Sequence, residues 1–207
     1  DSLKSAERSP HLDPFKARNL DVLLWHDPLD IFIAPMLGEF REKRFRNAAD
    51  PEIALSPIDH EADGTQDEPT VAEPDFNRFV GRCVTTLGRR VTEVRASQVL
   101  RDSPVRLLGI NAQSEMQRIY RMMGREYEAP AHILEVNRNH PLIAGLSRLV
   151  TDKPDSPLIS LAIEQLYDSA LMQEGLHPNP SEMLPRVEEL LMIATDALVN
   201  PSTTEDR

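Results

Sequence analysis

The chain has 207 residues, one cysteine, 5% aromatic residues and a formal net charge of -11. Its length allows one large domain or two small ones. The acid excess argues against a nucleic-acid partner, and no apolar run approaches the roughly 20 residues of a membrane span. A single cysteine excludes an internal disulfide framework and fits a reducing compartment. We therefore expect a cytoplasmic protein, and we find no targeting segment.

Residues 1–49 predict an α/β unit. A short helix is expected over 11–18, and the continuous apolar run at 22–25 is typical of a central parallel strand covered on both faces. Asp27 and Pro28 then precede a second helix, in which Asp27 is expected to act as a cap. The apolar residues of this helix are Leu29, Ile31, Phe32 and Ile33. We interpret residues 1–49 as the end of a larger α/β domain.

An acidic, proline-rich stretch follows. Nine acids and no Lys or Arg lie between Asp50 and Asp75, so this stretch carries -9 of the net charge. Such a composition buries too little apolar surface to fold by itself. We predict a linker at 50–74 and a disordered tail at 201–207.

Residues 75–200 predict an α+β domain with a small three-stranded sheet. We expect a helix from Asp75 to Gly88, with Cys83 on its apolar face as unreactive core packing. The expected strands cover 91–96, 105–108 and 131–136, and the expected helices between and after them cover 112–123 and 141–150.

The helix at 112–123 has an apolar stripe of unusual composition. Met116, Ile119, Tyr120 and Met123 recur at i, i+3, i+4 and i+7. Such a stripe commonly packs on a sheet. Methionine-rich surfaces, however, also bind varied partners because the side chain is flexible and polarizable. Both interpretations stay open from the pattern alone.

A helical hairpin is predicted from Ser156 to Asn200. Ser156-Pro157 opens its first helix, Gly175 ends it, and Ser181 is a plausible cap for the second. Both apolar stripes are wider than one seam, so the hairpin either packs entirely within the chain or pairs with a second copy as an intermolecular four-helix bundle. The predicted interface residues are Leu158, Leu161, Ile163, Leu166, Leu171, Leu184, Val187, Leu190, Leu191, Ile193, Ala194 and Leu198.

Catalytic and metal-binding motifs are not recognised in the sequence. No glycine-rich phosphate loop occurs, and the six histidines and Cys83 lack metal-ligand spacing. The adjacent His26 and Asp27 are a weak acid–base candidate, because Asp27 is better explained as a helix cap. We therefore predict no catalytic residue, no metal and no cofactor for this chain.

Several short motifs, in order and at family spacing, resemble the C-terminal part of the ninety-kilodalton heat-shock chaperone family in its bacterial form. They are Ser9-Pro10-His11-Leu12, Val22-Leu23-Leu24 with Asp27-Pro28-Leu29-Asp30, Glu39-Phe40, Val91-Thr92-Glu93-Val94-Arg95, Leu100-Arg101-Asp102-Ser103-Pro104, Glu115-Met116, and Ile133-Leu134-Glu135-Val136-Asn137 with His140-Pro141-Leu142.

The resemblance implies an ATP-driven, homodimeric chaperone of which this chain holds the end of the middle domain and the dimerisation domain. The ATP and Mg²⁺ site would lie outside this chain. The helix at 112–123 would face the cleft between protomers and bind unfolded client proteins, and Phe32 stands where the family often has tryptophan. Tyr120 and Ile31 depart from the family pattern. The tail lacks the acidic pentapeptide of eukaryotic members, so helical-repeat co-chaperones are not expected. The rival interpretations are a purely structural dimerisation module and an enzyme subunit with an unrecognised site.

Overall fold

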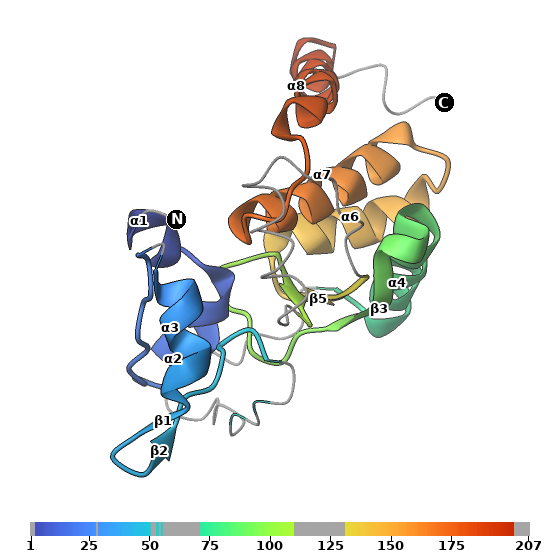
Figure 1. Ribbon diagram of the computed structural model, residues 1–207. Helices are drawn as coiled ribbons and strands as arrows, with labels where there is room; N and C mark the ends of the chain where they lie inside the picture. Colours follow the sequence, from blue (N-terminus) through green and yellow to red (C-terminus); the bar gives the residue numbers. More distant parts are fainter. Residues whose placement is uncertain are drawn as a thin grey trace.

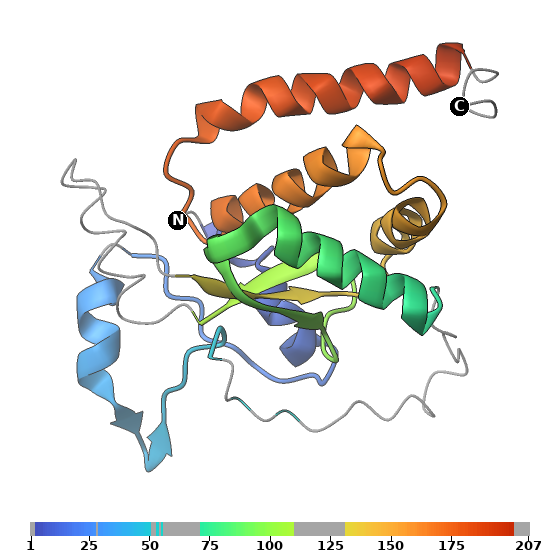
Figure 2. The same ribbon diagram turned by 90° about the vertical axis from the view of Figure 1, so that its right-hand side faces the viewer.

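A computed structural model of the chain describes residues 3–27, 29–50, 53, 55, 71–109 and 131–200. The helix predicted at 112–123, the tail at 201–207 and most of the predicted linker lie outside this part. Within it, a small sheet is covered on one face by helices, while the N-terminal segment lies on the other face (Figure 2). The elements are α1 (Leu3–Ala6), η1 (Pro10–Leu12), α2 (Asp13–Lys16), α3 (Asp30–Leu37), β1 (Glu39–Phe40), β2 (Lys43–Arg44), α4 (Glu73–Leu87), η3 (Gly88–Arg90), β3 (Val91–Ala96), β4 (Val105–Leu108), β5 (His132–Val136), α6 (Pro141–Asp152), α7 (Pro157–Gln173), η4 (Pro180–Met183) and α8 (Leu184–Val199).

The three-stranded sheet has the order β3-β5-β4, with β5 in the centre. β5 runs parallel to β3 and antiparallel to β4, and Leu134 lies opposite both Val94 and Leu107. Successive side chains of a strand point to opposite faces. This alternation places His132, Leu134 and Val136 together in the core. The predicted α+β class is confirmed, and the three strands fall where the sequence predicted them.

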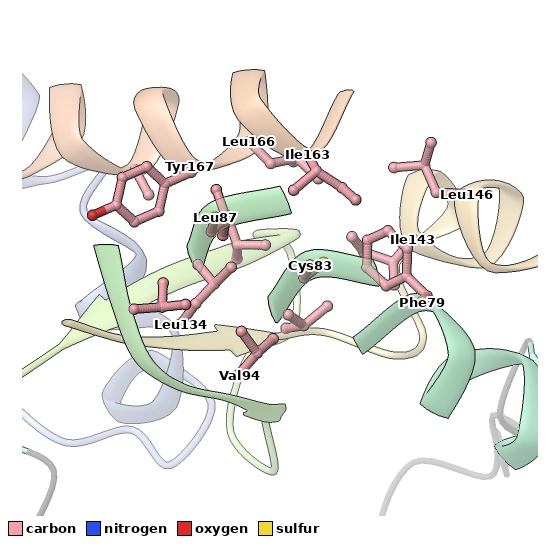
Figure 3. Close-up of a cluster of buried hydrophobic side chains, with 14 of the residues drawn as sticks. Phe79, Cys83, Leu87, Val94, Leu134, Ile143, Leu146, Ile163, Leu166 and Tyr167 are labelled. Atoms are coloured by element: carbon pink, nitrogen blue, oxygen red, sulfur yellow. The ribbon is translucent and has the colours of Figure 1, made fainter. Parts of the chain in front are cut away.

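The core lies between this sheet and the helices α4, α6 and α7 (Figure 3). Phe76, Phe79, Cys83 and Leu87 recur on one face of α4 and are all buried. Burial raises the pKa of the Cys83 thiol to about 12, because the charged thiolate loses its hydration. Cys83 is therefore a core residue with a protonated thiol, as predicted.

The N-terminal segment differs from its prediction. The expected helix over 11–18 divides into η1 and α2. The apolar run at 22–25 forms no strand, and Leu23 is 67% exposed. A strand needs a neighbour for its backbone N–H and C=O groups, and within the described residues none runs beside this segment. Asp27 is not the cap of α3: the residue before the helix is Leu29, and the Asp27 carboxylate instead accepts a hydrogen bond from the Leu29 amide at 2.9 Å, in the turn that leads into α3.

Polar contacts join the N-terminal segment to the rest. His11 Nε2 lies 2.6 Å from Glu174 Oε1 at the end of α7, and both side chains are buried. A cavity of about 380 Å³ between α2 and the sheet is lined in part by Phe15, Arg95, Arg106 and Glu135. Glu135 accepts hydrogen bonds from both arginines, which compensates the loss of hydration of its buried carboxylate.

Candidate functional surfaces

The helix α7 is largely used inside the chain. Ile163 is 1% exposed, and Leu166 and Leu171 are also buried against the rest of the core. The Tyr167 hydroxyl donates a hydrogen bond to the Arg90 carbonyl at 3.1 Å, and burial raises its pKa to about 12. A side chain already enclosed by its own chain offers little area to a second copy. Ile163, Leu166 and Leu171 therefore belong to the core and are not free for the predicted interface.

Two other predicted interface residues on α7 keep part of their surface. Leu158 and Leu161 are half-buried near the start of the helix. Gly175, whose φ is 64°, follows the opposite end of the helix. The start of α7 thus has apolar surface that the described chain does not cover completely.

Arg186 forms the polar contacts that join α8 to α7 among the described residues. Arg186 donates hydrogen bonds to the Asp168 carboxylate and, at 3.2 Å, to Gln165 Oε1. Helical spacing places Val187, Leu190 and Ile193 toward the same side, and all three are half-buried.

α8 begins differently from the prediction. The turn η4 precedes it, Asn179 rather than Ser181 is the residue before that turn, and the Ser181 hydroxyl donates to Asn179 Oδ1 at 2.6 Å.

A second stripe of α8, next to these half-buried side chains, is apolar and uncovered. Leu184, Leu191 and Leu198 recur every seven residues and are 60%, 62% and 85% exposed. Ala194 is exposed as well, and no residue of α8 is buried. Both ribbon views show α8 standing clear of the sheet and of α4 and α6 (Figures 1 and 2). A continuous apolar surface of this kind is typical of an interaction site.

A second exposed apolar surface lies on α3. Leu29, Ile33, Met36 and Leu37 are exposed, and Met36 reaches 86%. Phe32, the predicted client-binding residue of this region, lies within α3, but its side chain is outside the description. Sequence reasoning did not select Ile33, Met36, Leu37 and Phe40, although they recur at i, i+3, i+4 and i+7. That periodicity was available to find them.

The other predicted client-binding residues, Met116, Ile119, Tyr120 and Met123, lie outside the described residues. In the part of the chain that is described, no three His, Cys, Asp or Glu side chains form a group able to hold a metal ion. His26 is exposed, and the Asp27 carboxylate accepts the Leu29 amide. The prediction that neither residue acts in catalysis stays a prediction.

Comparison with known proteins identifies the family of the chain. The family described as Hsp90 protein matches residues 1–207. The chain belongs to the Hsp90 family. This confirms the resemblance that the short motifs indicated, and it makes the chain part of a chaperone family.

Several bacterial Hsp90 proteins, each named chaperone protein HtpG, are similar to this chain. The protein of Chlorobium phaeovibrioides is 34% identical over 189 residues, which are 90% of this chain and 29% of the relative. That of Oleidesulfovibrio alaskensis is 33% identical over 197 residues, 93% of this chain and 31% of the relative. That of Mycolicibacterium paratuberculosis is 35% identical over 170 residues, 81% of this chain and 26% of the relative. The chain thus spans less than a third of these relatives.

No helix among the described residues is both long enough and apolar enough to cross a membrane.

Proposed function

We propose that this chain is the part of a bacterial Hsp90 chaperone that forms the homodimer and contributes to the binding of unfolded client proteins. The observation that carries the proposal is the pair of exposed apolar helices, α8 and α3, on a chain of this family. The cytoplasm is the proposed location. ATP and Mg²⁺ are proposed to bind to other residues of the longer protein, because this sequence has no phosphate-binding loop.

The proposed dimer interface is a four-helix bundle made by α7 and α8 of two copies. α8 would contribute Leu184, Leu191 and Leu198 from its exposed side, and α7 would contribute Leu158 and Leu161. Full burial of one leucine is worth about 1.5–3 kcal/mol. Several such residues from each copy are enough to offset the loss of translational and rotational freedom on association.

Sedimentation or light scattering tests the dimer. The unmodified chain is expected to have twice the mass of 23.4 kDa, whereas the triple variant L184S/L191S/L198S is expected to be a monomer. The triple variant L3S/L20S/L23S is the matched control, because it removes three exposed leucines from the N-terminal segment. An unmodified chain that stays monomeric at micromolar concentration contradicts the proposal, and so does a dimer that survives the α8 changes.

The proposed client surface combines α3 with the methionine stripe at 116–123. The variant M116N/M123N is expected to keep the thermal midpoint of the chain and to weaken binding of an unfolded model protein. Exposed substitutions usually change stability by less than about 0.5 kcal/mol, whereas Met→Ala in a core costs roughly 2–5 kcal/mol. A large fall in the midpoint would favour the second candidate function, a structural dimerisation module whose methionine helix is packed.

The fragment itself is proposed to have no enzymatic activity. Calorimetric titration with ATP and Mg²⁺ is expected to give no saturable heat, and saturable binding would contradict this part of the proposal.

A further inference from the structure

The helix α3 continues directly into the hairpin β1–β2, and residues 29–46 together form what we call the α3 arm. Resting on the proposed client-binding function, we propose that the α3 arm selects unfolded client segments in which acidic residues adjoin apolar ones. The arm protrudes at one side of the molecule, where α3 leads into the hairpin tip (Figures 1 and 2). Its helical end is apolar and its hairpin end is basic.

The helical end of the α3 arm is apolar. Ile33 and Met36 are exposed on α3, and Phe40 is exposed on the adjoining strand. Helical spacing places Ile33, Met36 and Leu37 along the same side of α3. An extended client segment needs such uncovered apolar side chains as anchors, because charge alone is strongly hydrated and binds weakly in water.

The hairpin end is basic although the whole chain is acidic. Arg41, Lys43, Arg44 and Arg46 outnumber Glu39 and Glu42, which gives the hairpin 39–46 a formal charge of +2 within a chain of -11. Arg46 is paired with Asp50 at 2.7 Å, so the cations available to a ligand are Arg41, Lys43 and Arg44. The side chains of Arg41, Lys43 and Arg44 are exposed. None of these three forms an ion pair with another described residue; Arg41 lies over the Phe40 ring, with its guanidinium carbon 5.2 Å from the ring centroid.

The acidic residues near the helical end of the arm already accept hydrogen bonds from the backbone. The Asp27 carboxylate accepts the Leu29 amide, and the Asp30 carboxylate accepts the Asp27 amide, each at 2.9 Å. The arm is thus polarised, with hydrogen-bonded carboxylates at the start of α3 and the exposed cations Arg41, Lys43 and Arg44 after it. A bound segment that places apolar residues on α3 would place its neighbouring residues on these cations.

Contacts at the base hold the hairpin in place. Its turn contains two residues with positive φ, Arg41 at 49° and Glu42 at 66°, which is the backbone of a tight two-residue hairpin turn. The Phe45 amide donates to the Gly38 carbonyl at 3.1 Å. Phe45 also packs edge-on against Trp25, with 5.8 Å between ring centroids. A defined hairpin keeps its cations in a fixed position relative to α3.

Three short unstructured peptides test the proposal, all with the same leucines and phenylalanines. One has flanking Asp and Glu residues, the second has flanking Lys residues, and the third has flanking Ser residues. Fluorescence anisotropy with the full 207-residue chain gives the dissociation constant of each. We expect the acidic peptide to bind about tenfold more tightly than the basic one at low salt, since each exposed charge pair contributes modestly. The difference should shrink in high salt, because the screening length falls from about 10 Å at 0.1 M to about 3 Å at 1 M.

The variant R41Q/K43Q/R44Q is expected to lose the preference for the acidic peptide while it still binds the serine peptide. The control K4Q/R8Q/R89Q removes three exposed cations elsewhere, so it has the same net charge and should keep the preference. The variant I33S/M36S should weaken binding of all three peptides.

The outcomes separate this inference from the proposed function. If the serine peptide binds but the three peptides bind equally well, the charge selection is overturned and the client surface stands. If the hairpin and control variants lose the preference equally, the net charge of the chain is responsible and the α3 arm is not. If no peptide binds, the client-binding part of the proposed function fails first.

Discussion

The helices α7 and α8 have the same kind of sequence and opposite surroundings. Each carries leucine and isoleucine at three- and four-residue steps over about four turns. In the structure, α7 buries Ile159, Ile163 and Leu166, whereas α8 buries none of its residues. Amphipathic periodicity therefore predicts that a helix has an apolar face, but it does not tell whether the face is covered by the same chain.

The difference has a physical cause in the neighbours of each helix. α7 lies over the sheet and beside α4, so the wide stripe on α7 meets apolar partners on two sides. α8 contacts α7 along a single line, on the side that carries Arg186. The exposed leucines of α8 point away from that line. α7 thus completes the core, whereas α8 leaves apolar side chains exposed.

Replacing one apolar residue on each helix, buried Ile163 on α7 and exposed Leu191 on α8, should give the largest contrast. I163A is expected to lower the free energy of unfolding by about 2–5 kcal/mol, because it leaves a cavity in a packed core. Urea denaturation monitored by circular dichroism measures it. L191A on α8 is the variant to compare with it. For the dissociated monomer, it should change the free energy of unfolding by no more than about 0.5 kcal/mol. If both variants lose the same free energy of unfolding at low protein concentration, α8 is part of the core.

The sequence predicted the packed unit well and the exposed parts less well. β3 and β4 have the predicted bounds because β-branched and apolar residues alternate there between turn residues. The run at 22–25 was predicted to be a buried strand, yet Leu23 is exposed, since local pattern cannot show whether a neighbouring strand is present. Ile163 and Leu191 each belong to an apolar stripe with helical spacing. Only the three-dimensional structure shows that Ile163 lies in the core and Leu191 on the surface.

The structure divides the predicted interface residues by their exposure. The exposure of Leu184, Leu191 and Leu198 fits the proposed interface, whereas Ile163, Leu166 and Leu171 are core residues. Met36 was missed although it lies on the periodic stripe of α3, and periodicity alone would have marked an apolar face without showing that the face is exposed. The stripe at 116–123 remains a prediction from its composition.

The attachment of α8 to α7 can be weakened separately. R186M removes the hydrogen bonds to Asp168 and Gln165 and should cost about 1–2 kcal/mol, since a partly buried charged pair is worth more than an exposed one. Hydrogen exchange should become faster for amides of α8 while those of α4 and β5 stay protected. R78M, which breaks the exposed pair with Asp75, is the control. Faster exchange throughout the chain after R186M would show that α8 and the core unfold together.

The smallest expected effect concerns a buried histidine near the end of α7. His132 on β5 is completely buried, and neither of its ring nitrogens has a hydrogen-bond partner among the described residues. Burial lowers its pKa, while Glu174 at the end of α7 acts in the opposite direction. The folded state therefore holds this imidazole neutral, and unfolding allows it to take up a proton at its ordinary pKa of about 6.5.

The sign of the pH dependence follows from that proton. The unfolded state binds more protons than the folded state as the pH falls below about 6.5, so the stability contributed by neutral His132 is complete above this pH and is lost toward its lower folded pKa. H132L should make the free energy of unfolding fall less between about pH 7.5 and about pH 5.5. H26Q changes an exposed histidine and should leave the slope of the unmodified chain. If H132L keeps the original slope, water reaches His132 in the folded state, and the end of α7 is less tightly closed than the structure indicates.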